Sequence, residues 1–78
     1  MLRKGDIYKQ CEVAYDDAIE LLEMLERLEP DQTEKINNIR YHLKLIELFQ
    51  YKVEHEDLTT EELLSCYNIA LSWGLRPN

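Results

Sequence analysis

The chain has 78 residues, of which 45% are hydrophobic and 32% are charged, a composition typical of one small folded domain. Its 16 acidic and 9 basic residues give a net charge of −7, which disfavours direct binding to nucleic acid. With only 2 glycines and 2 prolines, it lacks the turn residues of an all-β domain. No apolar run approaches the roughly 18–20 residues that span a membrane. We therefore expect a cytoplasmic protein without a membrane partner.

The first helical pattern covers residues 7–28 and follows Asp6, a suitable N-cap. Apolar residues recur there at alternating spacings of four and three, which predicts one buried seam along the helix. Its members are Ile7, Cys11, Ala14, Ala18, Leu21, Leu25 and Leu28. Glu29 and Pro30 end the pattern, because the residue before a proline is driven out of the helical region.

The second helical pattern covers residues 32–54 and starts at Asp31, which together with Glu34 is typical of a capping box. It carries two apolar rows on nearly opposite sides of the helix. The row expected in the core is Ile36, Ile39, Leu43, Ile46 and Val53, and the second row is Tyr41, Leu45 and Leu48. Either the third helix covers the second row, or the row stays exposed for a partner or a second copy.

The third helical pattern covers residues 60–73 and has the clearest start, with Thr59 as N-cap and Glu62 three residues later. Leu58 before the cap is placed to pack on Leu63. The apolar face predicted for this helix comprises Leu63, Leu64, Tyr67, Ala70 and Leu71. Gly74, followed by Leu75, is typical of a helix stop in which glycine takes the left-handed conformation.

These three patterns predict an all-α fold. Because the connections between the helices are short, neighbouring helices should be antiparallel. We expect a long antiparallel helical hairpin plus a shorter third helix, which together form a three-helix bundle. Residues 1–78 are expected to form a single helical domain, because the chain has no internal repeat and no linker composition.

The acidic residues are concentrated in residues 12–34, which hold nine acids and the single base Arg27. Four of the acids recur three or four residues apart and should form one exposed acidic ridge: Glu12, Asp16, Glu20 and Glu23. One interpretation is a solvated face that keeps a small protein soluble. The other is a surface that docks on a basic partner and speeds association by electrostatic steering.

We find no pattern of catalytic, cofactor-binding or metal-binding residues. Cys11 and Cys66 lie in different helical patterns without a His or Cys three or four residues away, so we expect reduced thiols and no zinc site. His42 is expected to be a partly buried structural residue. Residues 54–57 lack the ligand geometry of a calcium loop and are interpreted as a solvated linker. The chain is therefore not expected to be an enzyme.

In size, charge and lack of catalytic motifs, the chain resembles the small acidic single-domain proteins that phages and mobile elements make to disable a host protein. That resemblance implies a non-enzymatic inhibitor or modulator of a larger protein with a basic surface. The predicted partner-binding residues are Glu12, Asp16, Glu20, Glu23, Tyr41, Leu45 and Leu48. One alternative is a structural homodimer or assembly subunit that pairs through the second helix. A second is a DNA mimic, whose carboxylates occupy a nucleic-acid-binding surface.

Overall fold

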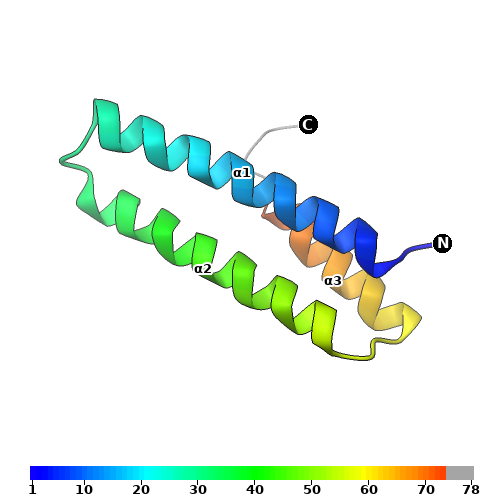
Figure 1. Ribbon diagram of the computed structural model, residues 1–78. Helices are drawn as coiled ribbons and strands as arrows, with labels where there is room; N and C mark the ends of the chain where they lie inside the picture. Colours follow the sequence, from blue (N-terminus) through cyan, green and yellow to red (C-terminus); the bar gives the residue numbers. More distant parts are fainter. Residues whose placement is uncertain (74–78) are drawn as a thin grey trace.

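The computed structural model describes residues 1–73, and this part of the chain contains three α-helices and no strand. The helices are α1 (Lys4–Leu28), α2 (Thr33–His55) and α3 (Thr60–Ser72). The expectation of an all-α chain with three helices is confirmed (Figure 1). None of the described helices combines the length and the apolar character that crossing a membrane requires.

Both other helices pack on α1, whereas α2 and α3 contact each other only weakly. The start of α1 lies beside the end of α2, where Lys4 Nζ donates hydrogen bonds to the backbone oxygens of Glu56 at 2.6 Å and Glu54 at 3.4 Å. These carbonyls stand at the C-terminal end of α2, where a helix leaves its acceptors unsatisfied. The shorter α3 lies against the N-terminal half of α1 (Figure 1).

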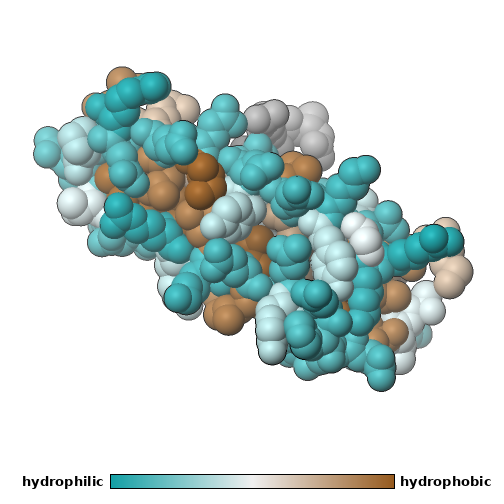
Figure 2. Space-filling view, viewed as in Figure 1, coloured by the Kyte–Doolittle hydropathy of each residue, from teal (hydrophilic) through white to brown (hydrophobic). Residues whose placement is uncertain are grey.

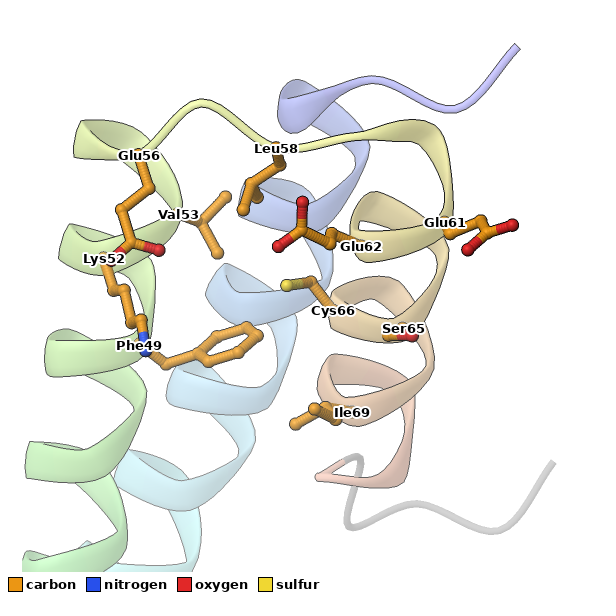
Figure 3. A pocket seen from close by; sticks show the side chains of 10 residues that line it. All are labelled: Phe49, Lys52, Val53, Glu56, Leu58, Glu61, Glu62, Ser65, Cys66 and Ile69. Carbon is orange, nitrogen blue, oxygen red and sulfur yellow. The ribbon is translucent and has the colours of Figure 1, made fainter.

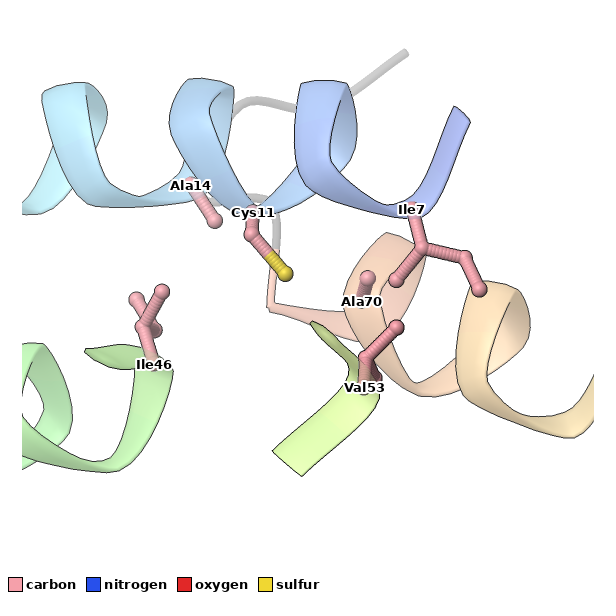
Figure 4. Packing of buried hydrophobic residues seen from close by; sticks show 6 residues of the cluster. All are labelled: Ile7, Cys11, Ala14, Ile46, Val53 and Ala70. Carbon is pink, nitrogen blue, oxygen red and sulfur yellow. The ribbon is translucent and has the colours of Figure 1, made fainter. Parts of the chain in front are cut away.

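The core is a narrow strip between these helices, and small side chains on α1 make up much of it. Its fully buried members on α1 are Ile7, Cys11, Ala14 and Ala18. Ile46 and Val53 reach the strip from α2, and Ala70 reaches it from α3 (Figure 4). Alanine and cysteine at these positions let two helix backbones approach α1 closely, which compensates for the small number of large core residues.

Three residues that the sequence placed on buried faces are exposed instead. Leu28 is 64% exposed because α3, at 13 residues and about 20 Å, reaches only half of the 25-residue α1, which is about 37 Å long. Leu64 is 54% exposed and Leu71 is 46% exposed. They stand seven residues apart on one edge of α3, which packs mainly against a single helix and so buries only a narrow arc.

The predicted cap of the third helix is confirmed. Thr59 Oγ1 accepts a hydrogen bond from the backbone N–H of Glu62 at 3.2 Å, and Glu62 Oε1 accepts one from the backbone N–H of Thr59 at 3.0 Å. Leu58 and Leu63 both pack against the core beside this cap. The helix stop predicted at Gly74 and Leu75 lies outside the described residues.

The two other predicted caps are wrong. The first helix begins at Lys4 with Arg3 as N-cap, and Asp6 is its third residue, whose Oδ2 accepts from the Arg3 N–H at 2.9 Å. The N-cap of α2 is Gln32, and its side chain makes no capping hydrogen bond. Asp31 lies in the preceding turn, where its backbone oxygen accepts from the Thr33 N–H at 2.9 Å. Asp31 therefore stands one residue too early to cap the helix.

We predict that Thr59→Ala lowers the free energy of unfolding by about 1 kcal/mol through the lost cap, measured by urea denaturation. Thr60→Ala is the matched control, because Thr60 is an exposed residue of the same turn that makes no capping bond. The control should stay within about 0.5 kcal/mol of the parent. Equal losses in the two variants would show that the cap is not the source.

We predict that Leu43→Ala costs about 2–5 kcal/mol of stability, because the Leu43 side chain is only 8% exposed and its truncation leaves a cavity. Leu48→Ala removes the same atoms from the same helix at a position that is 59% exposed, and should cost under about 1 kcal/mol in the monomer. Thermal melts at low micromolar protein concentration compare the two. Similar losses would mean that both rows of α2 are equally buried.

Candidate interaction surfaces

The acidic ridge lies on the side of α1 that faces away from the core strip. Its four members, Glu12, Asp16, Glu20 and Glu23, are all exposed. Hydrophilic side chains dominate the outer edge of α1 in Figure 2. Residues four apart on a helix are separated by ~6 Å along its axis, so the ridge is a row of regularly spaced carboxylates. Any partner that meets this side of α1 encounters a concentrated negative field.

The second apolar row of α2 is exposed in the described structure. Tyr41 is 66% exposed, Leu45 is 37% exposed and Leu48 is 59% exposed, and Tyr51 beside them is 62% exposed. Figure 2 shows apolar side chains projecting at the lower edge of the molecule, over α2. Of the two alternatives that the sequence left open, the row stays exposed within residues 1–73, because α3 packs on α1 and barely contacts α2.

The aromatic side chains near the end of α3 are engaged with each other. Trp73 meets Phe49 edge-on, with ring centroids 4.8 Å apart and planes at 80°. The His42 ring approaches the same Trp73 edge-on at 5.8 Å and 88°. Phe49 and His42 are both half-buried, in agreement with a structural role for His42. These contacts hold the residue that follows α3 near α2, and they cover part of the Phe49 ring.

A groove of about 440 Å³ lies between α2 and α3, where the two helices fail to meet (Figure 3). Its apolar lining includes Phe49, Val53, Leu58, Cys66 and Ile69, and its charged lining comprises Lys52, Glu56, Glu61 and Glu62. Periodicity did not predict this groove, because Cys66 and Ile69 fall outside the predicted apolar face of the third helix. The usable signal was an apolar arc on that helix wider than one neighbour can cover.

Both cysteines are free thiols in the described structure. Burial, and secondarily the neighbouring Cys66, raises the pKa of the Cys11 thiol. Burial also raises the pKa of Cys66, with Glu62 acting in the same direction and Lys52 opposing it. Since the thiolate is the reactive and metal-binding form, both groups are kept in the less reactive protonated state at neutral pH.

Tyr15 and Glu47 link α1 to α2 by a side-chain hydrogen bond, in which the Tyr15 hydroxyl donates to Glu47 Oε1 at 3.0 Å. This bond is the main cause that raises the pKa of Tyr15, and burial and the Glu47 charge act in the same direction. The bond lies on the α2 side of α1, away from the acidic ridge.

With these surfaces described, comparison with known proteins adds no relative: no family model, no curated protein and no solved structure matches the chain. The function of the protein must therefore be inferred from the chemistry of its own surfaces.

We predict that Tyr15→Phe lowers the melting temperature at neutral pH by removing the bond to Glu47. The pKa of Tyr15 is higher in the folded protein than its value near 10 in the unfolded chain. The bond therefore contributes its full stabilisation at pH values below about 10. The stabilisation is lost as the pH rises through the raised pKa of Tyr15. The difference in melting temperature between parent and variant should therefore shrink in that alkaline range. Tyr41→Phe, at a 66% exposed position, is the control and should leave the melting temperature at neutral pH unchanged.

Proposed function

We propose that this protein is a small non-enzymatic interaction module that binds, and thereby inhibits or modulates, a larger protein with a basic surface. It acts in the cytoplasm as a three-helix bundle in which α1 and α2 form an antiparallel hairpin. The supporting observation is the exposed acidic ridge on α1, Glu12, Asp16, Glu20 and Glu23. Neither nucleic acid nor a membrane is proposed as a direct partner.

The ridge is costly to the isolated helix, which is why it supports a binding role. Like charges spaced four residues apart destabilise a helix by a few tenths of a kcal/mol for each pair. The outer side of α1 could have carried alternating acids and bases at no such cost. A continuous acidic row raises the rate of encounter with a basic surface and orients the two proteins before contact.

The exposed row of α2 supplies a second surface of the module. Tyr41, Leu45 and Leu48 combine one aromatic and two aliphatic side chains, the residue types that give protein interfaces their affinity. Because the ridge lies on α1 and the row lies on α2, the module can make an electrostatic contact and an apolar contact on different sides. This arrangement suits a protein that acts by binding other proteins.

We predict that the triple variant Glu12→Lys, Asp16→Lys, Glu20→Lys folds like the parent, because all three positions are exposed, but no longer retains the basic partner. Immobilised parent and variant proteins are compared in pull-downs from the source cell with mass spectrometry. The protein retained by the parent alone is then purified and titrated by calorimetry. Circular dichroism checks the fold of each variant.

The matched control reverses three exposed charges elsewhere, with Glu29→Lys, Asp31→Lys and Asp57→Lys, and should keep the partner. If both triple variants bind equally well, the ridge is not the contact. Competition separates the proposed protein contact from a DNA mimic, since only a mimic displaces nucleic acid from its target.

A further inference from the structure

The exposed row of α2 belongs to a longer seam that runs along the whole helix. Residues on this side of α2 recur at alternating spacings of four and three, the heptad spacing of helices that pair along their length. The seam consists of Glu34, Asn38, Tyr41, Leu45, Leu48 and Lys52, all of them exposed, and Lys52 at its end also borders the groove between α2 and α3. It is separate from the core row of the same helix, so the helix carries two heptad seams and only one of them is covered in the described structure.

Two of the three kinds of pair in this seam are complementary when it is reversed, and the third sets Asn38 opposite Leu48. Its spacing reads the same in both directions about residue 43, so an antiparallel copy places Tyr41 opposite Leu45 at the centre. The same register places Glu34 of each copy opposite Lys52 of the other, about 14 Å from the centre on either side. Parallel pairing would instead place Glu34 against Glu34 and Lys52 against Lys52. Neither residue has an ion-pair partner among residues 1–73.

We propose that the occupant of this seam is a second copy of the chain, which pairs with the first through α2 in antiparallel orientation. This inference rests on the proposed function, because it takes the α2 row to be a protein contact. It adds that the partner at this contact is a second copy of the chain. The exposed parts of Tyr41, Leu45, Leu48 and Tyr51 amount to roughly 450 Å² per copy. With flanking polar groups this reaches the lower limit of about 1,000 Å² in total for a specific interface, so the dimer is weak and reversible.

The charge of the molecule also selects α2 for self-association. Residues 33–55 hold four bases and three acids, a net charge of +1, while residues 1–32 carry −5 and residues 56–78 carry −3. Two copies that met through the ridge side of α1 would bring acidic surfaces together, whereas α2 can approach its own copy without strong repulsion.

One flanking residue opposes the pairing and supplies an independent test of the register. Lys44 lies beside the seam near its centre, and the antiparallel arrangement brings Lys44 of both copies to the same flank. Removing this like-charge contact with Lys44→Gln should tighten the dimer two- to fivefold. Weakening by this substitution would contradict the proposed register.

Sedimentation equilibrium of the full chain, from micromolar to millimolar concentration, tests the proposal. The parent protein should form a dimer within this range, and a parent that stays monomeric throughout would overturn the proposal. Glu34→Lys and Lys52→Glu alone should each weaken the dimer about tenfold, because each creates two like-charged pairs. The double variant should recover the parent affinity. In a parallel dimer, by contrast, the single variants would leave the affinity unchanged.

The apolar centre is tested with a matched pair of leucines. Leu48→Glu places a charge in the seam and should abolish the dimer, while Leu64→Glu places it on α3, at a position that is 54% exposed and outside the seam. Circular dichroism must show both variants folded, and Leu45→Glu serves in place of Leu48→Glu if the latter unfolds. A dimer that survives in folded Leu48→Glu or Leu45→Glu would exclude this seam.

Dimerisation through the α2 seam does not depend on the acidic ridge. The triple ridge variant should dimerise at least as well as the parent, because its substitutions lie on α1. Loss of partner binding without loss of the dimer supports both proposals separately. A monomeric parent that still binds its basic partner through the ridge would overturn the dimer and leave the proposed function standing.

Discussion

The rest of the structure depends on a single strip of small and apolar residues along α1, against which both other helices must pack. Ile7, Cys11, Ala14 and Ala18 are all fully buried, and α2 and α3 meet at this strip from different directions. Because α2 and α3 are held by α1 and barely by each other, a groove opens between them. For the same reason the outer side of α2 faces no other helix within residues 1–73. The groove and the exposed row of α2 therefore both result from the packing of α2 and α3 on α1.

Much of the fold could be predicted from sequence because it is set by local rules. The alternation of apolar residues located three helices, and Thr59 with Glu62 marked the start of α3 correctly, since both capping bonds join residues three apart. Asp31 misled the same reasoning, because the helix has Gln32 as its N-cap and Asp31 stands one residue too early. The acidic ridge was predictable too, since a run of charged residues at helical spacing can hardly be buried.

What periodicity could not predict is how far along a helix its neighbour extends. Leu28 continues the α1 seam without a break, yet it is 64% exposed because α3 ends alongside the middle of α1. Leu64 and Leu71 are exposed for the related reason that α3 has one main neighbour and not two. The pattern identifies the side of a helix that can be buried, whereas the lengths and angles of the other helices decide how much of it is buried.

The acidic ridge and the α2 seam lie on different helices, so the two surfaces can be used at the same time. Pairing through the α2 seam leaves the ridge of each copy open, because the ridge lies on α1, so the dimer would present two acidic rows. A partner with two basic sites at a matching distance would then be held by both rows, and the second contact would form at a high effective concentration. A partner with a single basic site would gain nothing from the dimer. A weak dimer would thus make the strength of the proposed binding depend on protein concentration and on the symmetry of the target, and a chain of 78 residues would gain selectivity without any larger interface.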